Sequence, residues 1–108
     1  MIDMEQFSRS MEFNHTGMQL LLTDFITHYH CPMTRLQSLC EEEDYLGLMT
    51  YASKLKMTLA LFSDQDTPVK LAQLEHLAKH EFNPPEELMK NIQLDLEVVE
   101  QQIKQLTQ

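Results

Sequence analysis

The chain has 108 residues, of which 43% are hydrophobic, and this length suits one domain with a modest core. Its formal net charge of −9 opposes binding to nucleic acid or to anionic lipid, because both repel an acidic surface. Only 2 glycines and 4 prolines occur among many Leu, Met, Glu, Gln and Lys residues, so the composition favours helix over sheet.

The sequence carries no signal for export or membrane insertion. No segment approaches the ~20 consecutive apolar residues of a membrane span, and MIDMEQFSRS lacks the basic start and apolar run of a signal peptide. Cys31 and Cys40 are at no framework spacing, so we expect buried or half-buried free thiols in preference to a disulfide. A cytoplasmic location follows as the expectation.

The first elements predicted are a short N-terminal helix over residues 3–10 and a longer helix through GMQLLLTDFITHYH. Asn14 or Thr16 is the expected N-cap of the longer helix. Apolar residues at helical spacing predict which side chains point inward. These are Met4 and Phe7 in the short helix and Met18, Leu21, Leu22, Phe25, Ile26 and Tyr29 in the longer one.

Pro32 interrupts this longer helix, because proline removes a backbone hydrogen bond, and a break is expected near His30 and Cys31. MTRLQSLC then resumes the pattern with Leu36, Leu39 and Cys40 inward. The carboxylates of residues 41–44 suit the start of the next helix, where they meet the positive end of its dipole.

The second half of the chain predicts three helices. The first has an unusually regular buried stripe at steps of 3 and 4 over about five turns. Asp66 or Thr67 is the expected cap of the second, with Pro68 at its first position. Asn83 and Glu86 resemble a capping box for the last, with Pro84 in its first turn. The inward positions are Tyr45, Leu48, Ala52, Leu55, Leu59 and Phe62, then Leu71, Leu74, Leu77 and Ala78, then Leu88, Ile92, Leu96, Val99, Ile103 and Leu106.

These elements predict a single all-α domain over residues 1–108. Four main helices with short connections suggest an antiparallel up-down-up-down four-helix bundle with a short extra N-terminal helix. This pattern alone names no function.

The segment YASKLKMTLALF, residues 51–62, resembles the helix that carries the phosphorylated histidine in histidine-phosphotransfer (HPt) domains. That family's helix reads roughly Ala-His-x-Leu-Lys-Gly-Ser/Ala, and Ala52, Leu55 and Lys56 match it. The chain before it looks like the family's leading helix and acidic corner, and LAQLEHLAKH after it is similar to a later family helix. The resemblance spans about residue 18 to the C-terminus and implies the four-helix bundle of that family.

Two positions depart from the family pattern. Ser53 stands where the phosphorylated histidine should be, and serine has no ring nitrogen to attack an aspartyl phosphate. A serine phosphate ester is also a poor donor back to aspartate, so no relay is expected even if Ser53 were phosphorylated. Met57 replaces a glycine that leaves room for the partner's active site.

The remaining outward positions of this helix match the face with which the family docks response-regulator receiver domains. Helical geometry places Met49, Ser53, Lys56, Met57 and Ala60 together, and Lys54 adds positive charge beside them. For the lysines, helix solubility is the competing interpretation, and for the two methionines it is partial burial against a neighbouring helix.

No catalytic or metal-binding pattern competes with this interpretation. In HYHC, His28 and His30 point apart on a helix, and no second cluster stands at zinc-finger spacing. His76 and His80 share a helix face but lack a His-Glu-x-x-His motif, so both are interpreted as surface histidines. We expect no metal, no cofactor and no enzymatic activity of the chain's own.

The function predicted from the sequence is that of an HPt-like protein in two-component signalling that has lost the transferable histidine. It would bind a receiver domain or a histidine kinase through the face around Ser53 without relaying phosphate. The alternative is a helical adaptor or self-associating bundle unrelated to phosphorelay. A second alternative, an active carrier using another histidine such as His15, ranks lowest because His15 lacks the Leu-Lys frame.

Overall fold

The computed structural model describes residues 1–107, which form six helices. They are α1 (Met4–Ser10), α2 (His15–His28), α3 (Pro32–Glu41), α4 (Tyr45–Leu61), α5 (Thr67–Lys79) and α6 (Glu86–Thr107). Within this range the only β-pairing is an isolated bridge between Ile2 and Asp64, which confirms the predicted all-α class. None of these helices is both long enough and apolar enough to cross a membrane.

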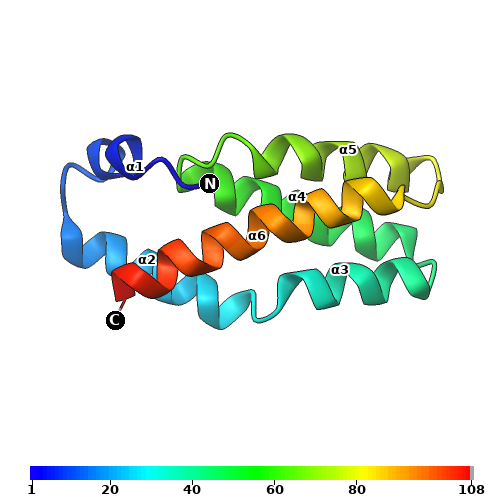
Figure 1. Ribbon diagram of the computed structural model, residues 1–108, viewed down its shortest axis with the longest axis horizontal. Helices are drawn as coiled ribbons and strands as arrows, with labels where there is room; N and C mark the ends of the chain where they lie inside the picture. Colours follow the sequence, from blue (N-terminus) through cyan, green and yellow to red (C-terminus); the bar gives the residue numbers. More distant parts are fainter. Residues whose placement is uncertain (108) are drawn as a thin grey trace.

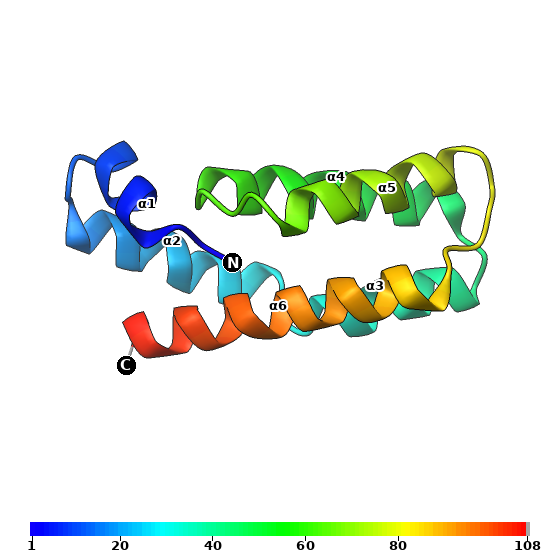
Figure 2. The ribbon, with the colours of Figure 1, turned by 45° about the horizontal axis from the view of Figure 1, so that its top comes forward.

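The helices are arranged in two layers. Helices α4 and α5 lie side by side in one layer, while α2, α3 and α6 form the other (Figure 2). Helices α2 and α3 follow one another end to end, and α4, α5 and α6 then run back and forth along the long axis (Figure 1). Helix α1 packs beside the α4–α5 loop, where the Phe7 and Phe62 ring centroids are 5.4 Å apart.

The buried core follows the predicted stripes of α4, α5 and α6 closely. Of the predicted inward residues, Tyr45, Leu77, Leu88 and Leu106 are only half-buried, and among these Leu88 and Leu106 pack against the core. In α2 the prediction was too wide, because Leu21 is 41% exposed and Ile26 is 39% exposed. The buried side chains of α2 are Met18, Leu22 and Phe25, a narrow stripe at steps of 4 and 3. Leu21 and Ile26 flank this stripe and lie outside the contact with the rest of the core.

Short side chains cap three of the helix starts. Asn14 Oδ1 accepts from the Gly17 N–H at 3.0 Å, as predicted for α2. Asp3 and Asp44 cap α1 and α4 in the same way. At Gly47, a β-carbon would lie 2.4 Å from Asp44 Oδ2, so the close cap of α4 depends on glycine there.

Helices α5 and α6 begin differently from the prediction. Asp66 occupies the N-cap position of α5, but its side chain makes no cap hydrogen bond. Asp64 Oδ1 accepts instead from the Asp66 N–H at 3.0 Å and the Thr67 N–H at 3.1 Å. Helix α6 begins at Glu86 rather than at Pro84, and Asn83 accepts a hydrogen bond from the Tyr45 hydroxyl at 2.9 Å. The predicted capping box of Asn83 and Glu86 is therefore wrong.

Four helices end in a left-handed residue that is not glycine. Helix α4 is typical: Ser63 has φ 61°, its N–H donates to the Ala60 carbonyl, and the Asp64 N–H donates to the Leu59 carbonyl. This pairing is the Schellman motif, in which glycine is usual because its missing β-carbon removes the steric cost. Glu12, Glu43 and Glu81 occupy the equivalent positions after α1, α3 and α5.

The predicted break between α2 and α3 is present, with Pro32 as the first residue of α3. Cys31 precedes it in a left-handed conformation with φ 50°. Cys31 is exposed, which corrects the expectation that both thiols are covered, whereas Cys40 is half-buried. Both are free.

Candidate functional site

Helix α4 carries the candidate site. One face of the helix is wholly buried, and this determines which of its residues face outward. Leu48, Ala52, Leu55 and Leu59 have no exposed surface, and they fix the rotation of the helix about its axis. Ser53 lies at the midpoint of α4 and is half-buried. The rotation places it on the flank of α4, between the core and the outer surface.

The predicted docking face divides into an exposed part and a covered part. Met57 is 65% exposed, and Lys54 and Ala60 are also exposed. Met49 is half-buried and packs against the core, so for this residue partial burial prevails over the predicted outward position. Of the two interpretations of the methionines, burial against neighbouring residues therefore applies to Met49, and exposure to a partner remains open for Met57.

Lys56 is held by an ion pair to the neighbouring helix. Its Nζ lies 2.7 Å from Glu75 Oε2 on α5, and the two side chains are 30% and 26% exposed. The contact shows that this flank of α4 faces α5. The ammonium charge that the HPt resemblance assigns to a phosphoryl group is therefore compensated within the chain itself.

Two further apolar residues of α4 are exposed, with Thr50 and Lys54 between Leu46 and the Met57–Leu61 pair. Leu46 is 71% exposed and Leu61 is 73% exposed, and with Met57 they follow steps of 11 and 4 on the outer side of the helix. Leu46 and Leu61 were not among the residues predicted for the docking face. Their helical spacing relative to Met57 was the available signal.

The opposite flank of α4 contacts α2 through polar aromatic groups. The rings of Tyr29 and Tyr51 are 5.9 Å apart, and the Tyr29 hydroxyl lies 3.4 Å from Thr58 Oγ1. Burial, aided by the nearby Tyr29 and opposed by Arg35, raises the pKa of Tyr51 to about 12. The phenol is therefore neutral at physiological pH, and this flank supplies packing rather than charge.

The histidines do not form a second candidate site. His76 and His80 stack edge-on with ring centroids 4.8 Å apart, and both are exposed at the end of α5. Among residues 1–107, no three His, Cys, Asp or Glu side chains converge as they would around a metal ion. His15 lies at the first position of α2, away from the midpoint of α4.

One polar cluster was not anticipated from the sequence. Asp64 is 3% exposed, and its Oδ1 also accepts from the Met1 amino group at 2.9 Å. Burial alone would raise the pKa of this carboxyl, but the Thr67 hydroxyl, the Met1 ammonium and the Thr67 N–H together hold it below its usual value. Asp64 Oδ2 and Thr67 Oγ1 are nevertheless buried without a well-formed hydrogen bond in the described chain. We assign this cluster a structural role, because its hydrogen bonds cap α5.

Comparisons with known proteins found no match among family models, curated proteins or solved structures. The candidate site is therefore defined by the residues of α4 and their contacts alone.

Proposed function

We propose that the chain is an HPt-like protein that binds a receiver domain or a histidine kinase without relaying phosphate. The observation that carries the proposal is the position of Ser53. It lies at the midpoint of α4, with Lys54 and Met57 exposed beside it. A receiver docking there would meet a hydroxyl where a phosphotransfer protein offers an imidazole.

The arrangement of the helices supports the same proposal. We infer an antiparallel up-down-up-down four-helix bundle in which α2 and α3 together fill one position and α1 is the extra N-terminal helix. The alternating directions of α4, α5 and α6 in Figure 1 agree with this inference. In such a bundle the outer side of α4 is available along its full length.

The chemistry at Ser53 limits what the protein could do. A serine hydroxyl lacks the neutral ring nitrogen that takes a phosphoryl group from aspartate. The exposed apolar surface of Met57 and Leu61 remains suited to contact with another protein. The protein would then compete with an active carrier, sequester a receiver, or report the receiver's phosphorylation through a difference in affinity between its two states.

The ion pair of Lys56 with Glu75 favours the second candidate, a helical adaptor or self-associating bundle unrelated to phosphorelay. Because the charge of Lys56 is already compensated by Glu75, it would attract a phosphoryl group less strongly than a free lysine. The exposed apolar residues Leu46, Met57 and Leu61 would serve an adaptor equally well.

The deciding experiment uses histidine kinases and receiver domains from the same organism, the receivers both phosphorylated and unphosphorylated. The wild type and the double variant Ser53→His, Met57→Gly are tested for binding and for phosphoryl transfer. We expect the wild type to bind a receiver without accepting phosphate and the double variant to gain transfer. Failure of both proteins to bind any receiver or kinase would favour the adaptor.

A matched pair of variants tests the location of the surface. Met57→Glu adds a charge in the middle of the proposed face, and Val98→Glu adds one on α6, where Val98 is 43% exposed. We expect Met57→Glu to weaken receiver binding about tenfold and Val98→Glu to leave it within about twofold. Equal effects of the two variants would show that binding does not use the outer side of α4.

A further inference from the structure

A groove opens at the end of the molecule farthest from the α4–α5 loop. It measures about 610 Å³ and lies between the C-terminal part of α3 and the first turns of α6. Cys40 and Glu41 line it from α3, Pro84 from the α5–α6 loop, and Met89 and Lys90 from α6. Cys40, Pro84 and Met89 are half-buried, so the groove has apolar side chains in its wall.

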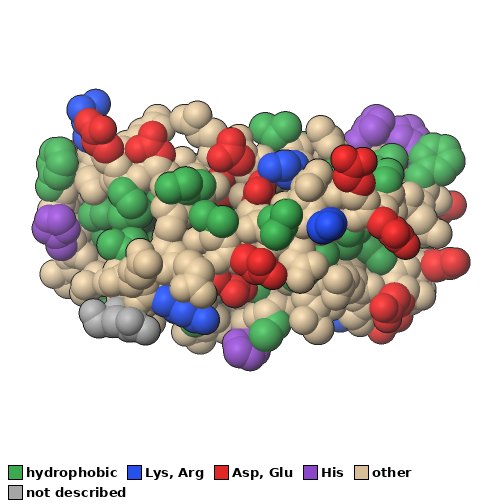
Figure 3. Space-filling model, viewed as in Figure 1, with side chains coloured by type: hydrophobic (Ala, Val, Ile, Leu, Met, Phe, Trp, Pro, Cys, Tyr) green, Lys and Arg blue, Asp and Glu red, His purple; other side chains and the backbone are tan. Residues whose placement is uncertain are grey.

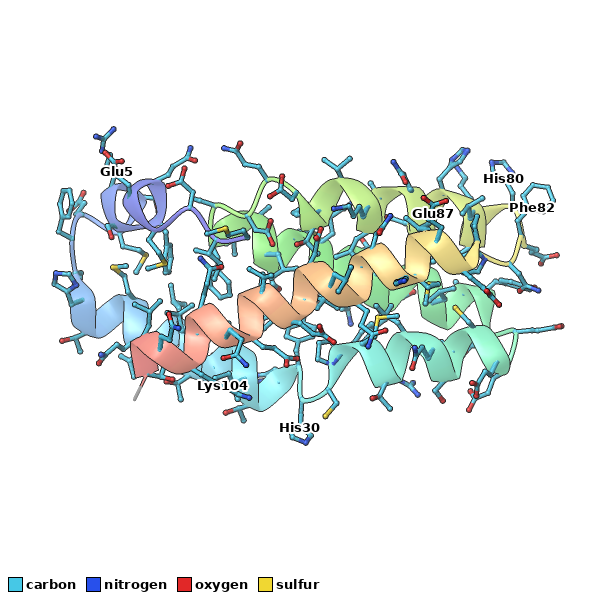
Figure 4. All side chains as sticks on the ribbon, viewed as in Figure 1. Glu5, His30, His80, Phe82, Glu87 and Lys104 are labelled. Carbon is cyan, nitrogen blue, oxygen red and sulfur yellow. The ribbon has the colours of Figure 1, made fainter. Side chains whose placement is uncertain are left out.

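The surface around this groove is strongly acidic. Residues 41–44, Glu81, Glu86 and Glu87 are all exposed, and we call these carboxylates, together with the groove, the acidic end. Figure 3 shows several acidic side chains at this end, and Figure 4 labels Glu87 on α6 together with His80 and Phe82, which follow α5. Two exposed lysines partly offset this charge: Lys90 lines the groove itself, and Lys79 is the last residue of α5.

A hydrogen bond connects the start of α4 to the α5–α6 loop at the acidic end. The Tyr45 hydroxyl, at the start of α4, donates to Asn83 Oδ1 on the α5–α6 loop. Helix α3 ends in a Schellman motif, in which the Asp44 N–H donates to the Leu39 carbonyl at 3.0 Å. The groove is therefore preformed, and a partner would not have to order these loops on binding.

The negative charge acts on the ionisable groups around the groove. Burial, with a contribution from Glu41, raises the pKa of the Cys40 thiol. Partial desolvation, followed by Glu43, Glu81 and Cys40, raises the pKa of Tyr45. Burial is the larger cause of both shifts, and the neighbouring carboxylates add to it. Those carboxylates would favour an incoming cation.

We propose that the groove between α3 and α6 binds a basic amphipathic segment of a partner protein. Apolar side chains of that segment would contact Met89, Cys40 and Pro84, and its lysines or arginines would face the carboxylates on the rim. A second copy of this chain is disfavoured as the occupant, because each copy has a net charge of −9. The proposal is independent of the face around Ser53, which lies on another helix.

The test uses a fluorescent synthetic helix of leucines and lysines as the probe, and its binding to the full chain is measured by polarisation. The variant Glu41→Gln, Glu86→Gln, Glu87→Gln, called the rim variant, removes three of the seven carboxylates of the acidic end. The control Glu5→Gln, Glu12→Gln, Asp24→Asn removes the same charge from exposed residues before and within α2. We expect the rim variant to weaken probe binding about tenfold and the control to change it less than about twofold.

Two further measurements separate groove binding from simple charge attraction. A probe with its leucines replaced by serines should bind the wild type at least about tenfold more weakly, because the groove wall is partly apolar. Amide chemical shifts of the wild type should change at Gln37, Cys40, Met89 and Gln93 on adding the leucine probe.

The proposal is overturned if the rim and control variants weaken binding equally, if the serine probe binds as well as the leucine probe, or if the shifts appear along α4 instead. Met57→Glu should leave probe binding unchanged, and the rim variant should leave receiver binding unchanged. The two proposals therefore succeed or fail separately.

Discussion

The two ends of the α4–α5 hairpin use carboxylates in opposite ways. At the α4–α5 loop, the carboxylate of Asp64 is buried and accepts hydrogen bonds from two backbone N–H groups and from the Met1 amino group. At the acidic end, the carboxylates of residues 41–44, Glu81, Glu86 and Glu87 remain in solvent. The negative charge of this chain therefore stabilises the fold at one end and remains exposed to solvent at the other.

The largest expected effect comes from removing the buried carboxyl. Asp64→Ala should lower the free energy of unfolding by about 2–3 kcal/mol, because it removes the cap of α5 and leaves two N–H groups without an acceptor. Urea unfolding measures this change. Asp66→Ala is the control, since the exposed Asp66 side chain makes no cap hydrogen bond, and it should cost less than about 0.5 kcal/mol. Equal losses in the two variants would contradict the assigned role of Asp64.

Acid should weaken the α4–α5 loop through the same carboxyl. The pKa of Asp64 is lower in the folded chain than its usual value, so the folded state binds fewer protons there than the unfolded state. The resulting stabilisation is fully present above the unfolded pKa of about 4 and is lost as the pH falls through the folded pKa. Unfolding free energies measured from about pH 5 to about pH 2 should fall less steeply in Asp64→Asn than in the wild type. Parallel slopes would show that Asp64 is not the responsible group.

Glycine at the left-handed helix ends should stabilise both ends of the hairpin. Ser63→Gly and Glu81→Gly each remove a β-carbon from a residue with φ near 60°. We expect each to raise the unfolding free energy by about 0.5–1 kcal/mol. Ser8→Gly, inside helix α1, is the control and should destabilise. A loss of stability in all three would contradict the backbone conformation assigned to these ends.

The smallest effect on stability is expected from the acidic end. Neutralising Glu41, Glu86 and Glu87 together should change the unfolding free energy by less than about 0.5 kcal/mol, since exposed charges contribute little. Two small contributions oppose one another there, because the substitutions relieve repulsion but remove favourable charges from the first turn of α6. Thermal unfolding measures this change. A large decrease in the unfolding free energy would show that these carboxylates stabilise the fold, as Asp64 does.

Local patterns predicted the parts of the fold that depend on one helix at a time. The stripe of α4 from Leu48 to Leu59, the break before Pro32 and the cap at Asn14 all follow from spacing or from one residue's chemistry. The exposed positions of Met57, Lys54 and Ala60 followed from the same spacing. Whether they bind a partner stays a prediction.

Features that depend on contacts between helices were not predictable in this way. The pairing of Lys56 with Glu75 requires the register of α4 against α5, and Leu21 is exposed because α2 buries only a narrow stripe. Asn83 was misassigned as a cap because α6 begins only at Glu86, and the Asn83 side chain accepts instead from Tyr45, which is remote in sequence. With only 2 glycines in the chain, the usual signal for a helix end was also missing after four helices.

The contact between Ile2 and Gln102 has a consequence for the order in which the molecule assembles. The Ile2 N–H donates to Gln102 Oε1 at 2.8 Å, and Gln102 Nε2 donates back to the Ile2 carbonyl at 3.0 Å, across a separation of 100 residues. Closing so long a loop costs more chain entropy than pairing α4 with α5, which are adjacent in sequence. The first residues should therefore dock last during folding and detach first in local opening. The exchange of the Ile2 amide proton with solvent would report that motion directly.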